Sequence, residues 1–245
     1  MKLDIRRIAA IGAVLATAFI SFSANANISL AGTRVIYPAQ NREVTVQMTN
    51  EGKKPSLVQT WIDDGDANAL PENIRVPFTL TPPVSRVNGG KGQALRIVYT
   101  GEALPQDRES VFYLNVLDIP PSEDGADGNQ LQFAFRTRIK MFFRPAQLAG
   151  DTSRVVDQVR WSLVTDQNGA AVLRATNPTG YYISLNKLSL SGSKAIDLQP
   201  QMIPPKGSYD FALPANTHPA ADASVVFQSV NDYGAMDDHT ATLTR

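Results

Sequence analysis

The stretch NQLQFAFRTRIKMFFR, residues 129–144, decides the fold. Its apolar and polar side chains alternate with a period of two, the pattern of a β-strand. One face carries Leu131, Phe133, Phe135, Thr137 and Ile139, and the other carries Gln130, Gln132, Arg136, Arg138 and Lys140, with Ala134 between them. At about 3.3 Å per residue such a strand spans roughly 45 Å, which is about two to three times the ordinary strand length.

Two interpretations of this strand stay open from its residues alone. It is either a long central strand whose apolar face fills the protein's own core, or an edge strand offered to a partner. Large aromatic residues on an exposed edge are an aggregation hazard. A partner that takes the strand into its own sheet removes that hazard, because the edge then has hydrogen-bonding neighbours.

The rest of the chain also reads as strands, because short segments rich in Val, Ile, Tyr, Phe and Thr alternate with turn clusters. The predicted strands are 28–37, 43–50, 56–63, 77–87, 92–99, 110–118, 130–143, 158–165, 171–176, 181–190, 208–213, 223–229 and 240–244. No long amphipathic helical pattern appears, which argues against a parallel α/β enzyme fold. We predict an all-β protein with two immunoglobulin-like β-sandwich domains, 27–147 and 148–245, joined by a small polar linker within 146–154.

The N-terminus has the pattern of a secretory signal peptide over residues 1–26. Basic residues come first, an apolar run follows from Ile8 to about Phe22, and small residues stand at Ala24 and Ala26. The run is shorter than the roughly 20 residues that a membrane-spanning helix needs. We therefore expect cleavage before Asn27, and a mature chain that is exported without membrane insertion.

The composition excludes several classes of partner and site. The signal holds three of the 23 basic and one of the 23 acidic residues, which leaves 20 against 22 and no strong field for nucleic acid or an anionic membrane. There is no cysteine, so each sandwich has to be held together by core packing. The two histidines, His218 and His239, have neither the spacing nor the neighbours of a metal site.

Nothing in the sequence predicts catalysis, and we expect no cofactor. The segment Asp237-Asp238-His239-Thr240 is better explained as a solvated turn before the last strand than as part of a triad. The glycine-rich segment 89–92 leads into a predicted strand, whereas a phosphate-binding loop leads into a helix.

The segment TRIKMFFRP, residues 137–145, resembles the signature of the periplasmic pilus chaperones that work with outer-membrane ushers, the PapD-like family. Further matches follow in the family's order: TRV (33–35), TPP (81–83), PQDRES (105–110), NPTGYY (177–182) and NDYG (231–234). One such motif is weak, but six in order cover nearly the whole mature chain. The resemblance implies two immunoglobulin-like domains arranged around a cleft.

The resemblance also assigns roles to individual residues. Arg34 and Lys140 match the two cations that hold the C-terminal carboxylate of a pilus subunit in the cleft. Leu131, Phe133 and Phe135 match the side chains that are donated to the subunit's incomplete sheet. Because Lys140 and Phe135 have opposite parity, we expect a bulge or a change of strand direction between the two sets.

A third matching set is Glu109, Arg144 and Asp232, which the resemblance makes a charge cluster between the domains. The loop over 121–129 is short, which is typical of the short-loop group of the family. The implied partners are pilus subunits and an outer-membrane usher, and the implied compartment is the periplasm. Whether the free protein caps its own edge as a homo-oligomer stays open.

Two other functions compete with this one. A pilus subunit or adhesin is also an exported immunoglobulin-like chain, but it usually begins with a donor extension and often contains a disulfide. This chain enters a predicted strand at Ile28 and has no cysteine. A secreted carbohydrate-active enzyme needs converging carboxylates, and no sequence pattern places such a pair here.

Overall fold

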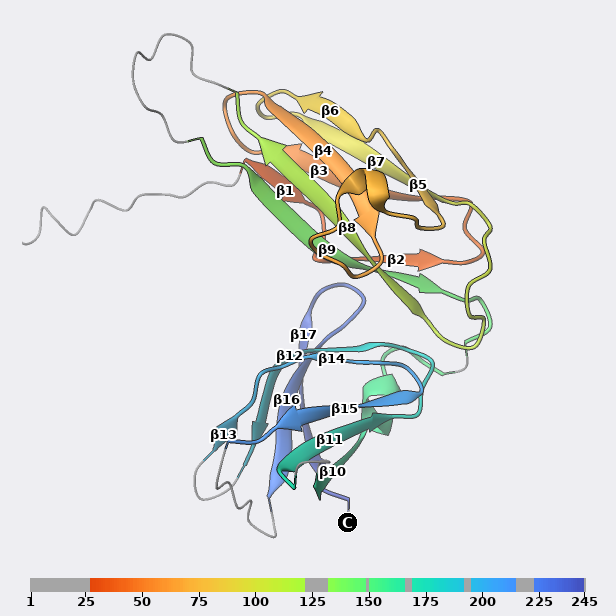
Figure 1. The fold of residues 1–245 in the computed structure, drawn as a ribbon, viewed down its shortest axis with the longest axis vertical. Helices are drawn as coiled ribbons and strands as arrows, with labels where there is room; N and C mark the ends of the chain where they lie inside the picture. Colours follow the sequence, from red (N-terminus) through yellow and green to blue (C-terminus); the bar gives the residue numbers. More distant parts are fainter. Residues whose placement is uncertain are drawn as a thin grey trace, which may run out of the picture.

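The computed structural model describes residues 27–121, 132–148, 150–165, 169–191, 195–214 and 223–244. It consists of two β-sandwiches, one above the other in Figure 1, each with its own apolar core. The described residues contain only two short 3₁₀ turns, η1 (Pro71–Asn73) and η2 (Val155–Gln158). Within the same residues, no helix is long and apolar enough to cross a bilayer. The predicted all-β fold class is confirmed.

The N-terminal sandwich packs two sheets face to face. The first has the order β1 (Ile28–Leu30), β3 (Val44–Asn50), β7 (Gly92–Tyr99) and β5 (Phe78–Thr81). The second has the order β2 (Arg34–Pro38), β9 (Phe135–Arg144), β8 (Ser110–Ile119), β4 (Ser56–Asp63) and β6 (Val84–Val87). Fully buried Tyr37, Leu95, Leu114 and Met141 fill the space between the sheets. The buried side chains in the C-terminal half of β9 therefore anchor this strand in the core.

The single strand predicted over 28–37 is two strands that belong to different sheets. β1 pairs with β3, whereas β2 pairs in parallel with β9 from Lys140 to Arg144. β9 therefore has neighbours on both sides only from Lys140 onward. Phe135 to Ile139 pair with β8 on one side and with no described strand on the other. The strand predicted over 77–87 divides in the same way, because Pro82 and Pro83 offer no N–H for a ladder.

The long predicted strand 130–143 is shorter in the structure. β9 begins at Phe135, and Gln132 to Ala134 are not in a strand, while Leu131 lies outside the described residues. The cause is the partner strand: the last pair between β8 and β9 joins Asp118 to Phe135. Two prolines follow the end of β8, so a ladder beyond this point has no donor.

The C-terminal sandwich also has two sheets. One has the order β10 (Arg160–Thr165), β11 (Ala171–Asn177) and β15 (Gly207–Ala212). The other has the order β13 (Ile196–Asp197), β12 (Ile183–Leu190), β16 (Ser224–Val230) and β17 (Met236–Thr242), with β14 (Met202–Ile203) paired to β12. Buried Trp161 lies between Phe211 and Phe227 in its core.

Two expectations for this half were wrong. The last strand begins at Met236 rather than at 240, so Asp237, Asp238 and His239 lie in β17 and not in a turn. β17 is an edge strand, where charged residues are tolerated because they discourage pairing with other chains. The His239 ring stacks on Phe227 with centroids 5.0 Å apart, and its Nε2 lies 2.9 Å from Ser229 Oγ. The short strands β13 and β14 were not predicted.

Candidate functional site

The two sandwiches meet where β2 and β9 approach the turns of the C-terminal sheet that contains β16 and β17 (Figure 1). Arg34 and Lys140 are register partners in the parallel pair of β2 and β9. Neighbouring residues in such a pair project from the same side of the sheet. The two cations are 106 positions apart in sequence, and the parallel pairing brings them together at this junction.

Arg34 is half-buried and has unused hydrogen-bonding capacity. Its Nη1 donates to the Val230 carbonyl oxygen at 2.7 Å, and its guanidinium carbon lies 5.8 Å from the centroid of the Phe142 ring. Its Nε is buried and has no hydrogen-bond partner. Burial lowers the pKa of Arg34, against the opposite influence of the carboxylates of Asp232 and Glu109. An oxygen ligand near Nε would satisfy this donor.

Lys140 is likewise half-buried, and its Nζ lies 3.5 Å from Ser184 Oγ of the C-terminal sandwich. Burial lowers the pKa of Lys140, and the positive charge of Arg34 lowers it further. Among the residues that the structure describes, neither cation forms an ion pair within 4.0 Å. Two neighbouring cations without a carboxylate repel each other, so an anion that binds between them is stabilised by both.

A small cavity of about 60 Å³ opens beside Arg34, which lines it together with Phe142, Ser184 and Val230, whereas Lys140 is not among its lining residues. Its wall also contains Arg144 and the carboxylates of Glu109, Asp232 and Asp237, so the cavity belongs to the charge cluster between the sandwiches and is not by itself an anion site.

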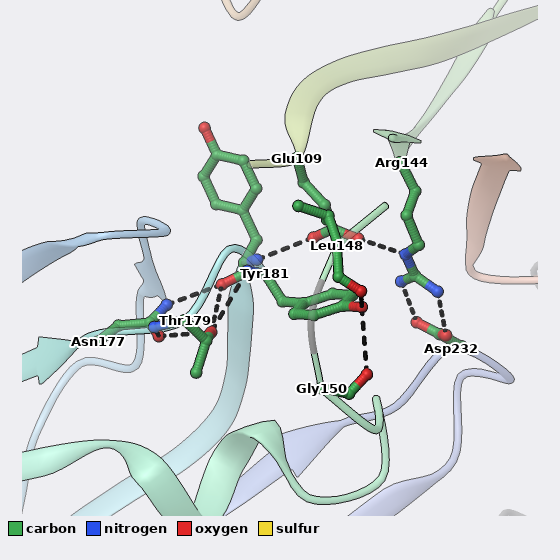
Figure 2. Close-up of polar contacts among 9 residues, drawn as sticks. Glu109, Arg144, Leu148, Gly150, Asn177, Thr179, Tyr181 and Asp232 are labelled. Carbon is green, nitrogen blue, oxygen red and sulfur yellow. Dashed lines mark hydrogen bonds and ion pairs between the residues drawn. The ribbon is translucent and has the colours of Figure 1, made fainter. Parts of the chain in front are cut away.

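Arg144 joins the two sandwiches through a charge cluster (Figure 2). Its Nε donates to Glu109 Oε1 at 2.7 Å, while Nη1 and Nη2 donate to the two oxygens of Asp232 at 2.7 and 2.8 Å. Glu109 Oε2 also accepts the backbone N–H of Tyr182 at 2.8 Å. Burial raises the pKa of Glu109, and the charge of Arg144 and the Tyr182 N–H act against it. The structure thus brings all three residues of the predicted cluster into contact.

Residues of the NPTGYY motif (177–182), to which the sequence analysis gave no individual roles, also hold the domains together. The Tyr181 hydroxyl lies 3.4 Å from the carbonyl oxygens of both Leu148 and Gly150, next to the turn that Asn177 and Thr179 build (Figure 2). The Glu109 N–H donates to the carbonyl oxygen of Gly180 at 2.8 Å. A Cβ on Gly180 would lie 3.0 Å from the Asp107 carbonyl oxygen, so the close approach needs glycine.

The aromatic residues proposed for donation are exposed in the free chain. Phe133 is 60% exposed and Phe135 is 51% exposed, whereas Phe143 on the same strand is 1% exposed. Phe135 continues the core-facing side of β9, on which Met141 and Phe143 are buried. Phe135 therefore continues the row of core-facing side chains of β9 beyond the core, where its ring is exposed to solvent.

The expected bulge between Phe135 and Lys140 is absent. β8 and β9 pair without a register shift from Phe135 to Phe143. The strand is regular, so odd-numbered residues face the sandwich interior and even-numbered residues, Lys140 among them, face outward. Phe135 and Lys140 therefore lie on opposite faces of β9, and neither a kink nor a bulge is needed to explain their parity.

Comparison with known proteins identifies the family of this chain. Residues 27–149 match the family described as "Pili and flagellar-assembly chaperone, PapD N-terminal domain", and residues 154–241 match "Pili assembly chaperone PapD, C-terminal domain". The probable fimbrial chaperone YadV of Escherichia coli K12 is 42% identical over 228 residues, which cover 91% of this chain and 92% of that protein. The chaperone protein FimB/FhaD of Bordetella pertussis is 40% identical and covers 96% of each.

Solved structures agree with this assignment. The crystal structure of the YadV chaperone aligns with a TM-score of 0.76 at 40% identity, covering 89% of this chain and 100% of that one. A chain of the Salmonella enterica SafA pilin complex with the SafB chaperone aligns with a TM-score of 0.73 at 26% identity, covering 89% and 96%. Both alignments extend over the two sandwiches and the junction between them.

Proposed function

The chain belongs to the PapD family of pilus-assembly chaperones, and from this premise we propose that it captures pilus subunits by strand donation in the periplasm and delivers them to an outer-membrane usher. Arg34 and Lys140 hold the subunit's C-terminal carboxylate. Leu131, Phe133 and Phe135 fill the gap in the subunit's core. Glu109, Arg144 and Asp232 fix the angle between the domains, 27–147 and 148–245, and so the shape of the cleft.

One observation carries the proposal: within the part of the chain that the structure describes, the unpaired edge of β9 ends at two cations that have no carboxylate partner. From Phe135 to Ile139 the strand has a described neighbour on one side only, and at Lys140 the second neighbour, β2, begins and brings Arg34 with it. A subunit strand added to this edge runs into the cleft, and its terminal carboxylate then lies between the two cations. Such charge-assisted hydrogen bonds are stronger than neutral ones.

The energetics favour a partner that lacks a strand of its own. The exposed rings of Phe133 and Phe135 contribute about 1.5–3 kcal/mol for each side chain that becomes fully buried. Backbone hydrogen bonds along the edge satisfy the amides and carbonyls of the partner's open sheet. The same edge suits a second copy of this chain when no subunit is present, which gives self-capping the same physical basis.

The signal-like residues 1–26 support the periplasm as the compartment. The solved complex of the SafA pilin with the SafB chaperone supports a pilin as the partner, because this chain aligns with a chain of it over both sandwiches. Delivery to an usher is part of the proposal on the strength of the family.

A pull-down from the cell envelope tests the proposal. The mature chain is tagged at its C-terminus, captured from the periplasm, and its partners are identified by mass spectrometry. The expected partners are immunoglobulin-like pilus subunits in equimolar complexes. Recovery of the chain without any such subunit, from cells that express pili, contradicts the proposal.

A further inference from the structure

Arg138 lies two residues before Lys140 on the same outward face of β9. Unlike Lys140, it forms an ion pair within the described part of the chain. Its Nε donates to Asp63 Oδ2 at 2.9 Å and its Nη2 to Asp63 Oδ1 at 2.5 Å, a bidentate ion pair. Nη2 also donates to the Gly65 carbonyl oxygen at 3.1 Å. Below it, the guanidinium carbon lies 3.6 Å from the centroid of the Tyr113 ring.

Asp63 is the buried partner in this ion pair. Its side chain is 1% exposed, against 21% for Arg138. It also accepts hydrogen bonds from Asn115 Nδ2 at 2.7 Å and from the Gly65 N–H at 2.8 Å. Burial pushes the pKa of Asp63 upward, but the hydrogen bonds from Arg138, Asn115 and Gly65 outweigh it and keep the pKa below its usual value. Asp63 is thus held as an anion under Arg138.

The position of this pair matters because of how a donated strand can slip. A one-residue slip is prevented because it turns every side chain to the other face. A two-residue slip keeps the faces and moves the subunit by about 6.6 Å along the strand. In one direction β2 blocks it, since β2 occupies the edge of β9 from Lys140 onward. In the other direction no described strand occupies the edge, and the next cation that a carboxylate meets is Arg138.

We propose that Asp63 is a specificity-determining residue for strand donation, because it neutralises Arg138, the cation that the subunit's carboxylate meets after a two-residue slip, and so disfavours that register against the one held by Lys140 and Arg34. This inference rests on the proposed function. Two features would then set the register of the subunit strand on β9. The start of β2 blocks a slip in one direction, and the neutralised charge of Arg138, two residues before Lys140, disfavours a slip in the other. Without the neutralisation of Arg138 by Asp63, two registers of the subunit strand that differ by two residues compete.

Double variants test this inference. The probe is a synthetic peptide copying the last strand of the subunit captured in the pull-down, made with a free carboxylate or with a C-terminal amide. On the otherwise unaltered chaperone, K140A should abolish the preference for the carboxylate form. Adding D63N unmasks Arg138, and the D63N/K140A chaperone should recover at least about tenfold in Kd for the carboxylate form. The triple variant D63N/R138Q/K140A should lose it again.

The Arg174–Asp210 pair supplies a matched control. It is another bidentate pair, between the neighbouring strands β11 and β15 of the C-terminal sandwich, with nitrogen to oxygen distances of 2.6 and 2.7 Å. D210N/K140A should recover nothing, because Arg174 is far from the open edge of β9. D63S/K140A repeats the unmasking with a second side chain in case D63N folds poorly, which circular dichroism shows.

The outcomes separate this inference from the proposed function. If the unaltered chaperone has no preference for the carboxylate peptide, the carboxylate site itself is wrong. If the preference is present and K140A removes it, but neither D63N nor D63S restores it, Arg138 is not a second carboxylate site that Asp63 neutralises, and the inference is overturned. Recovery in D63N/K140A that persists in the triple variant also overturns it.

Discussion

Arg34 and Lys140 face each other across the parallel strands β2 and β9, and no carboxylate of the described residues pairs with either of them. The pairing has two consequences for the molecule. It ends the open edge of β9, and it places two positive charges at that end. A strand with a C-terminal carboxylate is the partner that uses both features, because its backbone fits the edge and its last charge fits the cations.

Replacing Arg34 or Lys140 by Ala should sharply lower the yield of a co-expressed subunit in the periplasm, because the carboxylate loses a charge-assisted hydrogen bond. The measurement is the amount of subunit that co-purifies with the tagged chaperone. Arg160→Ala is the control, since Arg160 is an exposed strand residue of the C-terminal sandwich. An unchanged subunit yield in both cleft variants would contradict the assignment of Arg34 and Lys140 to carboxylate binding.

Binding of the carboxylate should weaken at alkaline pH earlier than an ordinary lysine predicts. Burial and the charge of Arg34 lower the pKa of Lys140 in the free protein. A bound carboxylate favours the charged lysine and raises that pKa, so binding takes up protons between the two values. Affinity therefore falls as pH rises through the pKa of the free protein.

The check is the ratio of Kd values for the carboxylate and amide peptides, measured from neutral to strongly alkaline pH. Lys140→Arg should flatten the profile, because arginine keeps its charge throughout this range. A profile that is the same in both proteins would mean that Lys140 does not face the carboxylate.

Arg144→Ala should destabilise the protein and loosen its domains. It leaves the carboxylate of Glu109, which is 3% exposed, without a cation. Breaking a buried ion pair in this way costs about 3–5 kcal/mol. Arg174→Ala removes an exposed bidentate pair and should cost far less, because exposed ion pairs contribute little to stability. Urea unfolding measures both, and small-angle scattering measures the spread of interdomain angles. Equal small costs would mean that the cluster does not set the angle.

Phe133→Glu should weaken subunit capture while the free protein stays folded. Phe133 is exposed and outside the strand, so its replacement removes no core contact. Phe143→Glu, by contrast, places a charge in the core and should unfold the N-terminal sandwich. Circular dichroism and co-purification separate the two effects. Unfolding of the Phe133 variant would support the interpretation in which its ring belongs to the protein's own core.

The sequence predicted the elements whose signal is local. β3, β4, β7 and β8 lie within about one residue of the predicted ranges, because alternation between two turns marks both ends of a strand. The strand over 28–37 was wrong as a single element, because its division depends on which sheet each half joins. The core-facing residues change from even numbers in β1 to odd numbers in β2, with Gly32 between them, and the prediction of one strand did not use this break in the alternation.

β9 shows the same limit at its start. The alternation continues from Gln132 to Phe135 apart from Ala134, but a strand also needs a neighbour, and the pairing with β8 ends at Phe135. The two aspartates before His239 suggested a turn, although an edge strand tolerates them. The residues Arg34 and Lys140 were named through family resemblance, and their roles stay predictions. The Asp63–Arg138 pair had no sequence signal, since only the fold brings residue 63 to residue 138.

Amide hydrogen exchange on β9 tests strand donation most directly. In the free protein, every second amide from Phe135 to Ile139 faces the open edge and should exchange quickly, while the others are hydrogen-bonded to β8. In the complex with a subunit, the edge-facing amides should become protected along with their neighbours. Edge-facing amides that still exchange quickly in a stable, equimolar complex would contradict the account, because the subunit would then be bound without using the strand.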